Sequence, residues 1–271
     1  MTSLHDRARH FRSLHVPGHP LVLPNAWDVA SARIIAAAGA SAMATTSAGV
    51  AWALGAADGD RLDRASAVGQ VAAIAAAVDL PVTADVEGGF ESDEDGVAGT
   101  VRAVLAAGAV GINIEDGTRS PAEHVRRIGV ARAAADAEGV PLFINARIDT
   151  YLAGLGDRAG RLEETLKRAA DCLAAGADGV FVPGVVAPEI VSALVKGVDA
   201  PLNVLVGHGA PAVAELAGLG VARISAGSSI AQAAHGLVRD AARELLTEGT
   251  CERLADGSTY GEMNALMSVP R

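Results

Sequence analysis

Short apolar runs alternate along this chain with longer Ala-rich stretches of helical period, and this alternation constrains the fold more than any other feature of the sequence. A short run followed by a helical stretch is the pattern of a βα unit. Eight such units close a (β/α)8 TIM barrel, and an open doubly wound sheet is the alternative. The expected strands cover residues 21–23, 42–46, 82–85, 111–115, 142–146, 179–182, 202–206 and 223–225.

The length of 271 residues fits a single barrel domain. We expect residues 1–271 to form that domain, with residues 233–271 as a C-terminal helical extension. The words Ala-Ala-Gly-Ala recur at 37–40, 106–109 and 174–177, shortly before expected strands. A glycine at such a place can end a helix in the left-handed conformation. The repeats therefore indicate the end of the barrel opposite the one that carries the chemistry in barrel enzymes.

The composition excludes several classes of function. A formal net charge of −10 opposes binding to nucleic acid and to an anionic membrane surface. Because no uncharged apolar stretch is long enough to span a bilayer, we expect no membrane association. Cys172 and Cys251 are the two cysteines and lie far apart in the sequence, which argues against a disulfide framework and favours a cytoplasmic protein.

Acidic residues follow several expected strands, at the face where the loops of a barrel converge. Asp85 and Glu87 follow the third strand, Glu115 ends the fourth, and Asp58 lies in the loop after the second. Converging carboxylates repel one another unless a cation neutralises them, and an all-oxygen set suits Mg²⁺, with Mn²⁺ as the alternative. We expect Asp85 to bind the metal directly, while Asp58, Glu87 and Glu115 hold its water shell. For any single acid, the alternative is a helix cap.

A substrate carboxylate is the expected partner of Arg147, which follows an apolar strand and carries a fork-shaped guanidinium. The alternative for Arg147 is a buried ion pair with Glu115 or Asp149. A small polar loop after the second strand offers backbone amides that could hold an oxyanion. The residues expected to bind the substrate are Thr46, Ser47, Ala48, Gly49, Arg147 and Asn203.

The expected catalytic residues are Arg147, Glu115 and His208. His208 follows the seventh strand on the same face and could act as an acid or base. Its alternative is a turn histidine that caps the next helix. His124 lies inside a helix that Ser120, Pro121 and Glu123 start, and we expect it at the surface.

These motifs, taken in order from about residue 20 to about residue 230, resemble those of the isocitrate lyase and phosphoenolpyruvate mutase superfamily. The resemblance implies a (β/α)8 barrel whose last helix is often exchanged between the subunits of a homodimer or homotetramer. It also implies Mg²⁺ at Asp85 and Glu87, with Asp58 and Glu115 on metal waters, and a 2-oxo acid held by residues 47–49 and Arg147. The motifs are Leu-Pro-Asn-Ala-Trp-Asp at 23–28, Thr-Thr-Ser-Ala-Gly-Val-Ala at 45–51, Leu-Gly-Ala-Ala-Asp at 54–58, Asp-Val-Glu-Gly-Gly-Phe at 85–90, Gly-Ile-Asn-Ile-Glu-Asp at 111–116, Asn-Ala-Arg-Ile-Asp-Thr-Tyr at 145–151 and Pro-Leu-Asn-Val at 201–204.

Two departures from the family pattern narrow the activity. The lyases carry a Lys-Lys/Arg-Cys-Gly-His loop after the fourth strand, where this chain has Gly-Thr-Arg-Ser-Pro at 117–121. The phosphonomutases carry an asparagine in a longer version of that loop and a histidine where this chain has Pro183. The remaining residues fit a Mg²⁺-dependent carbon–carbon lyase or decarboxylase that acts through an enolate on an oxaloacetate-like or methylisocitrate-like acid. The alternatives are a phosphonopyruvate-type carbon–phosphorus hydrolase or phosphonomutase, and a non-catalytic ligand-binding barrel.

Overall fold

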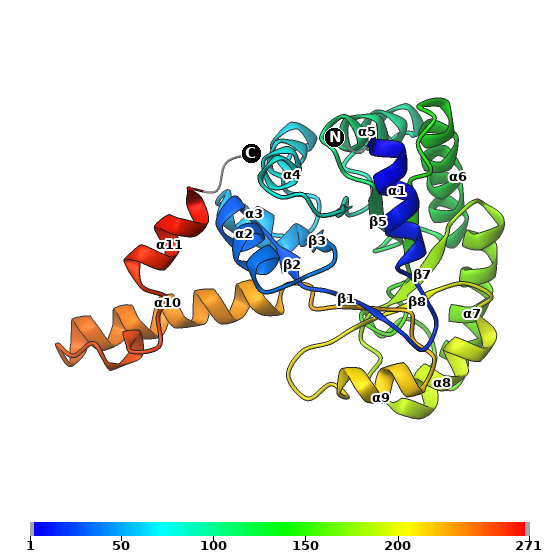
Figure 1. Cartoon of the computed structure of the whole chain (residues 1–271). Coiled ribbons are helices and arrows are strands. Elements are labelled where there is room, and N and C mark those ends of the chain that lie inside the picture. The colour runs from blue at the N-terminus through cyan, green and yellow to red at the C-terminus, as the bar shows by residue number, and fades with distance from the viewer. Residues whose placement is uncertain (1–2, 269–271) are drawn as a thin grey trace.

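The computed structural model describes residues 3–268 as a barrel of parallel strands with helices around it (Figure 1). All neighbouring strands pair in parallel, in the order β1-β9-β8-β7-β6-β5-β4-β3-β2. The strands are β1 (Leu21–Leu23), β2 (Asn25–Ala26), β3 (Met43–Thr45), β4 (Val82–Asp85), β5 (Gly111–Glu115), β6 (Phe143–Arg147), β7 (Gly179–Val182), β8 (Leu202–Leu205) and β9 (Arg223–Ser225).

The barrel closes through one strand that is divided in two. β1 pairs with β9 and β2 pairs with β3, and Pro24 alone separates β1 from β2. Proline has no N–H to give to a ladder, although its carbonyl still accepts a hydrogen bond from the amide of Ala44 at 3.3 Å. The two segments therefore serve as one barrel strand, which confirms the (β/α)8 prediction over the open sheet. The sequence pattern predicted the β1 half and missed β2.

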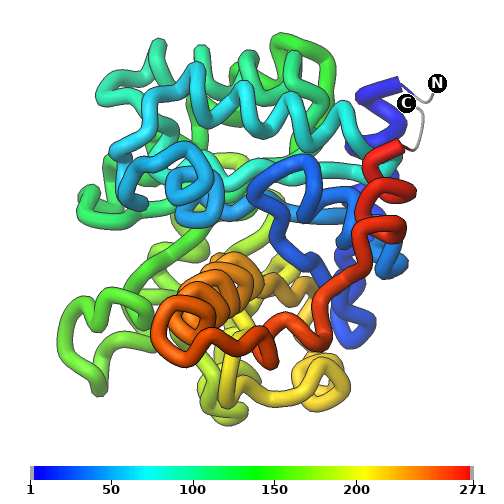
Figure 2. The backbone as a smooth tube through the Cα atoms, turned by 90° about the vertical axis from the view of Figure 1, so that its left-hand side faces the viewer, coloured from blue at the N-terminus to red at the C-terminus, as the bar shows by residue number. Residues whose placement is uncertain are grey.

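Helices alternate with the strands and cover the outside of the barrel, as Figure 2 also shows. Three predicted strands differ from the structure by one residue at one or both ends, and the other five match. The helices are α1 (Leu4–Ser13), α2 (Val29–Ala37), α3 (Ser47–Ala53), α4 (Arg64–Ala77), α5 (Glu94–Ala106), α6 (Pro121–Ala137), α7 (Arg161–Ala174), α8 (Pro188–Gly197), α9 (Val213–Gly218), α10 (Ser229–Thr247), the 3₁₀ helix η1 (Glu252–Leu254) and α11 (Tyr260–Met267).

The repeated Ala-Ala-Gly-Ala words end helices, as predicted. Gly39, Gly108 and Gly176 have φ angles of 91°, 93° and 109°, which lie in the left-handed region that glycine adopts without strain. Each turn leads to a strand at the amino-terminal end of the barrel. The catalytic residues expected from the sequence follow the opposite ends of the strands.

Helix α1 closes the amino-terminal end of the barrel. Phe11 of α1 is fully buried and packs edge-on against Phe143 of β6, with 5.8 Å between ring centroids. His15 stacks on the same Phe143 ring at 3.9 Å, and its Nδ1 donates a hydrogen bond to the carbonyl of Phe11. Gly111 and Gly179 leave room for these rings, since a Cβ there would lie 2.9 Å from Phe11 and 3.0 Å from Phe143.

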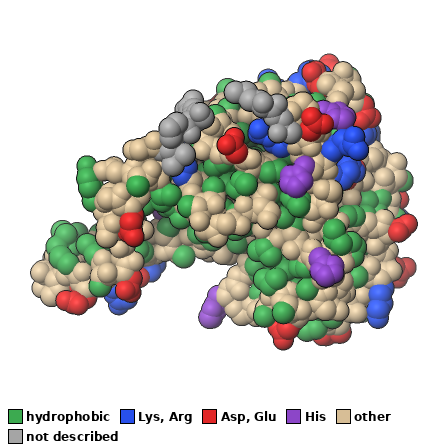
Figure 3. All heavy atoms as spheres, viewed as in Figure 1, with side chains coloured by type: hydrophobic (Ala, Val, Ile, Leu, Met, Phe, Trp, Pro, Cys, Tyr) green, Lys and Arg blue, Asp and Glu red, His purple; other side chains and the backbone are tan. Residues whose placement is uncertain are grey.

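The C-terminal helices form an arm at the side of the barrel. In Figure 1, α10 runs away from the barrel and α11 returns toward α2, where Arg33 donates hydrogen bonds to the carbonyls of Leu266 and Met267. Apolar side chains are exposed on this arm, among them Val238 at 67% and Leu246 at 85%, and Figure 3 shows hydrophobic side chains at its outer end. Among residues 3–268, no helix has the length and hydropathy needed to cross a membrane.

The burial of His15 predicts an acid-sensitive fold. Burial, followed by the positive charge of Arg223, lowers the pKa of His15 from 6.5 to about 3. Below pH 6.5 the unfolded chain therefore binds a proton that the folded chain refuses, so the free energy of unfolding falls as the pH drops. From pH 6.5 to pH 4.5 this group should remove about 2 to 3 kcal/mol. Urea unfolding at both pH values should reveal a shallower pH dependence in His15→Gln than in the wild type. The exposed His19→Gln control should keep the wild-type slope, and equal slopes in all three proteins would contradict the prediction.

Candidate active site

A cavity of about 300 Å³ lies at the carboxyl ends of the barrel strands. Its lining residues come from strands β2 and β4 to β9 and from the segment after β3, so closure of the barrel is what brings them together. Such a volume fits a small organic acid. The polar residues around this cavity, here called the rim cavity, are Asn25, Thr46, Ser47, Asp58, Asp85, Asn113, Arg147, Ser225, Ser228, Ser229 and Gln232.

Asp85 lies at the end of β4 with one carboxylate oxygen free. Its backbone N–H donates to Thr45 Oγ1 at 2.9 Å, and its Oδ2 accepts from the amide of Ser47 at 3.3 Å. Its Oδ1 is buried and has no hydrogen-bond partner among residues 3–268. A buried carboxylate oxygen without a partner is costly unless it binds a cation or a ligand.

The expected polar loop at residues 46–49 is the start of a helix. Thr46 is the N-cap of α3, and its Oγ1 accepts from the amide of Gly49 at 3.5 Å. Ser47 and Ala48 line the rim cavity, whereas Gly49 is buried behind them. A Cβ at Gly49 would lie 2.7 Å from Thr46 and 2.9 Å from Trp27, so a larger residue would push the helix away from its neighbours.

Glu87 sits in a strained turn after β4. Its φ of 50° is in the left-handed region, which costs a non-glycine residue about 1 kcal/mol or more. Its carboxylate accepts a hydrogen bond from the amide of Asp60. Burial raises the pKa of Glu87 to about 7, and the carboxylates of Asp60, Asp85 and Asp58 add to the rise while that hydrogen bond opposes it.

Arg119 links two loops above this turn. Its Nη2 lies 2.8 Å from Asp60 Oδ2. The guanidinium passes over Gly88, where a Cβ would come within 2.0 Å of Arg119 Nη1. Glycine at this position therefore lets the short loop after β5 reach the loop after β3. The sequence analysis did not select Arg119 or Asp60.

Arg147 forms the ion pairs that were its alternative reading, and it also lines the rim cavity. Its Nη1 lies 2.6 Å from Glu115 Oε2, while Nε and Nη2 donate to the two oxygens of Asp149 at 2.7 and 3.0 Å. These bonds use three of the five N–H groups of the guanidinium and leave two for a ligand. Burial lowers the pKa of Arg147, but Glu115 and Asp149 outweigh it and the net shift is upward.

The side chains around Asp85 and Arg147 carry more negative than positive charge. Burial raises the pKa of Glu115 to about 8; Arg147 opposes this rise, and Asp85, Asp149 and Glu87 increase it. A divalent cation near Asp85 would reverse these shifts, because it would offset the repulsion among the carboxylates. Within residues 3–268, no three His, Cys, Asp or Glu side chains lie close enough to hold an ion jointly. A Mg²⁺ site with one direct carboxylate and a shell of bound water needs no such group.

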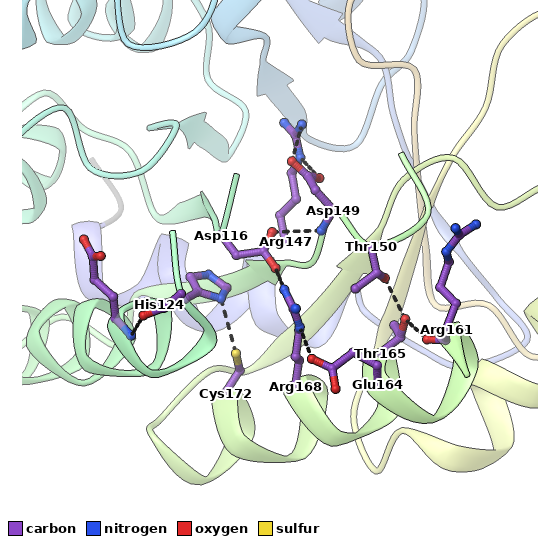
Figure 4. A network of polar contacts seen from close by, with 12 residues as sticks. Asp116, His124, Arg147, Asp149, Thr150, Arg161, Glu164, Thr165, Arg168 and Cys172 are labelled. Atoms are coloured by element: carbon purple, nitrogen blue, oxygen red, sulfur yellow. Dashed lines mark hydrogen bonds and ion pairs between the residues drawn. The ribbon is translucent and has the colours of Figure 1, made fainter. Parts of the chain in front are cut away.

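A buried network of hydrogen bonds and ion pairs orients Arg147 through its partner Asp149 (Figure 4). Asp116 is fully buried, and its Oδ1 accepts from the amide of Asp149 at 2.9 Å while its Oδ2 pairs with Arg168 at 2.8 Å. Arg168 in turn pairs with Glu164 one turn earlier on α7, also at 2.8 Å. Asp116 thus orients the backbone that carries Asp149, the partner of Arg147.

The prediction for His124 was wrong. Its side chain is 1% exposed, with Nε2 3.1 Å from the carbonyl of Ile114 and Nδ1 3.5 Å from Cys172 Sγ. Ser120 does cap α6, but the helix turns its first buried face inward at His124. Burial raises the pKa of the Cys172 thiol to about 12, and this cysteine is part of the same packed layer.

The remaining predicted site residues are spread over different environments. Asp58 is exposed at the edge of the rim cavity. Asn203 is fully buried below it and donates to Ser225 Oγ at 3.3 Å. His208 is exposed in the loop after β8 and is not among the residues that line the cavity.

Two asparagines that the sequence analysis passed over line the rim cavity. Asn25 Nδ2 donates to the carbonyl of Thr45 at 2.9 Å, and its Oδ1 accepts from the amides of Ala226 and Gly227 at 3.0 and 2.8 Å. Asn25 therefore ties the loop after β9 to β3. Asn113 lies on β5, directly beside Asp85 in the register. Both stood inside quoted motifs, and an inward position next to an acidic strand end was the signal that could have selected them.

Comparison with known proteins places this geometry in a family. The profile of the phosphoenolpyruvate phosphomutase family matches residues 11–246. The chain belongs to the phosphoenolpyruvate phosphomutase family. The resemblance to the isocitrate lyase and phosphoenolpyruvate mutase superfamily is thereby confirmed, and the chain is an enzyme of a superfamily of lyases and mutases.

Similar proteins cover nearly the whole of this phosphomutase-family chain. An uncharacterised protein of Mycobacterium tuberculosis is 38% identical over 260 residues, which cover 94% of this chain and 95% of that protein. A solved structure from Burkholderia cenocepacia, described as a candidate lyase/mutase, is 37% identical, covers 98% of this chain and 97% of its own, and has a TM-score of 0.90. A solved 2,3-dimethylmalate lyase is 25% identical, covers 98% of this chain and 91% of its own, and has a TM-score of 0.82.

The Asp116 network gives a stability prediction. Arg168→Leu leaves the fully buried Asp116 carboxylate without its cation, which should lower the free energy of unfolding by about 3 to 5 kcal/mol. Lys167→Leu on the same helix removes an exposed pair with Asp171 and should cost less than about 0.5 kcal/mol. Chemical denaturation of both variants measures the difference. Equal losses would mean that Asp116 does not depend on Arg168.

Proposed function

We propose that this phosphomutase-family enzyme is a Mg²⁺-dependent carbon–carbon lyase or decarboxylase that acts on a small 2-oxo or 2-hydroxy acid through an enolate. The observation that carries the proposal is that Asp85, whose buried Oδ1 has no hydrogen-bond partner among residues 3–268, lines the same cavity as Arg147. A metal-binding oxygen and a carboxylate-binding guanidinium in one small cavity suit an acid that carries an oxygen at C2. The likeness to 2,3-dimethylmalate lyase supports a small-acid substrate.

The residues present fit a magnesium ion. Asp85 would bind it directly, and Asp58, Glu87 and Glu115 would hold its water shell, with Mn²⁺ as a substitute. When bound, the ion would supply Lewis-acid stabilisation of the negative charge that develops at the C2 oxygen. The excess of carboxylates over cations around Asp85 favours a divalent ion at this place.

The protein's own groups would hold and orient the acid. Two N–H groups of Arg147 are free for a substrate carboxylate, and Glu115 and Asp149 keep the guanidinium plane fixed. The first turn of α3, with Ser47 and Ala48 on the cavity, would lie against the C2 oxygen. His208 is exposed outside this wall, so solvent is the proposed proton donor to the enolate.

The carbon–phosphorus alternative has less support. The loop after β5 is a short turn through Gly117 whose Arg119 is engaged with Asp60. Pro183 lines the rim cavity where the phosphonomutases carry a histidine, and proline offers no group for phosphate chemistry. We therefore place phosphonopyruvate second among substrates.

We also propose that the arm of α10 and α11 binds a second copy of the chain, giving a homodimer or homotetramer. Large apolar side chains that are exposed on a single chain often mark an interface with another chain. Leu246 and Tyr260 on this arm are each 85% exposed. Sedimentation should detect a dimer or tetramer for the wild type, and Leu246→Asp should weaken it. A monomeric wild type would rule the proposal out.

Metal-dependent turnover tests the proposed activity. Pyruvate release should occur from one member of a panel of oxaloacetate, malate homologues and 2-methylisocitrate with Mg²⁺, and a chelator should stop it. Asp85→Asn should reduce this release by at least about 100-fold, because the direct metal ligand loses its charge. The exposed Asp136→Asn on α6 should leave turnover unchanged. Phosphate release from phosphonopyruvate would favour the second candidate, and full activity in Asp85→Asn would refute the metal site.

A further inference from the structure

The middle of the barrel interior is polar, although barrel interiors are usually filled by branched apolar side chains. Asn113, Asn145, Asn203 and Arg223 come from β5, β6, β8 and β9, and each is 5% exposed or less. This layer lies between the aromatic rings at the amino-terminal end and the rim cavity. Polar groups at such depth cost stability unless they serve one another or a ligand.

Arg223 is the most costly member of this layer. It is 1% exposed, and burial lowers its pKa to about 9, so it remains charged at neutral pH. Its Nη2 donates to Asn113 Oδ1 at 3.0 Å, whereas Nε and Nη1 have no partner among residues 3–268. A buried arginine is a poor source of stability, and an apolar residue of similar volume is often as good or better. Stability therefore does not account for Arg223, and its hydrogen bond to Asn113 is the contact that can.

Asn113 is held in one orientation by two donors. Its Oδ1 accepts from Arg223 Nη2 at 3.0 Å and from Asn145 Nδ2 at 2.9 Å. Both acceptor positions of this oxygen are filled, which leaves the amide nitrogen Nδ2, at the other end of the planar amide group, without a role in this network. Asn113 lines the rim cavity, so the two N–H groups of Nδ2 are the donors that it can offer to a ligand there.

The floor position lies among the groups that would bind substrate. In the register, Asn113 is the partner of Asp85 on one side and of Asn145 on the other, two residues before Glu115, which pairs with Arg147. A neutral donor here, between a carboxylate and a guanidinium, suits an oxygen of a bound acid and not an apolar group.

We propose that Asn113 is a further substrate-binding residue, which donates a hydrogen bond from Nδ2 to a carboxylate or C2 oxygen of the acid, and that Arg223 and Asn145 are positioning residues that fix its orientation. This inference rests on the proposed function, because it requires a 2-oxo or 2-hydroxy acid in the rim cavity. The hydrogen bond from Asn113 would favour ligands that place an oxygen atom at the cavity floor over ligands that place an apolar group there.

Asn113→Asp tests the donor with the shape of the side chain preserved. An aspartate can still accept from Arg223 and Asn145, with a stronger, charge-assisted bond, so the fold should be at least as stable as the wild type. Its second oxygen replaces the donor at the floor, and the extra negative charge beside Asp85 should leave Mg²⁺ binding unchanged or tighter. Binding of oxalate in the presence of Mg²⁺, measured by calorimetry, should weaken by about 10- to 100-fold, the effect of one lost hydrogen bond to a charged group.

Arg223→Met tests the positioning role and covers the case in which Asn113→Asp fails to fold. Methionine removes the buried cation and fills a similar volume, so thermal stability should be kept. Asn113 then loses one of its two anchors, and we expect KM to rise several-fold with little change in kcat. Thr83→Val, a buried polar-to-apolar change in the same barrel that does not line the cavity, should leave KM unaltered.

The outcomes separate this inference from the proposed function. If the wild type binds neither oxalate nor pyruvate with Mg²⁺, the proposed function fails and this inference fails with it. If the wild type binds oxalate and Asn113→Asp binds it equally well, Asn113 is only a structural hub and the inference alone is overturned. Weaker oxalate binding with Mg²⁺ affinity kept supports it. Should Asn113→Asp fail to fold, a raised KM in Arg223→Met supports the inference and a wild-type KM overturns it.

Discussion

Closure of the strand ladder at Pro24 is the constraint on which the rest of the structure depends. β1 completes the ladder with β9 and β2 completes it with β3, so one interrupted strand joins the two edges of the sheet. Because every strand runs parallel to its neighbours, closure gathers all carboxyl ends at one rim. Residues that are far apart in the sequence thereby line one cavity that is large enough for a small molecule. The chemistry of the enzyme depends on these residues being brought together there.

Carboxylates are concentrated at the rim, and three arginines offset their negative charge in different ways. Arg147 lies among the acids and is pre-oriented by Glu115 and Asp149. Arg119 neutralises Asp60 at the outer edge. Arg168 compensates Asp116 below, where water has no access. The carboxylates near Asp85 keep a negative excess even so, and this excess supports the proposed divalent cation.

The sequence was sufficient for features that depend on local patterns. Apolar runs located the described strands other than β2 to within a residue, and repeated Ala-Ala-Gly-Ala words located the ends of three helices, because both follow from short-range sterics and periodicity. The acids and Arg147 could be selected since they follow strands. The pairing of Asp116 with Arg168, 52 residues apart, could not, because it depends on where the folded barrel places α7 relative to the end of β5. His124 was misjudged for the same reason: the Ser120 cap fixes where α6 starts but not which face turns inward. Asn113 could have been selected from its place two residues before Glu115, but its hydrogen bond with Arg223, 110 residues later, became visible only in three dimensions.

The closure described above also has a consequence for biosynthesis. The side chain of Asn25 bonds to the amide of Gly227, 202 residues later, and Phe11 of the first helix is covered by Phe143 from the middle of the chain. Residues near the start of this sequence therefore wait for partners that are translated much later. Until β9 emerges, β1 has an open edge and the apolar face of α1 lacks its cover, both of which favour association with other chains. Folding of this barrel is thus completed only after β9 has been translated.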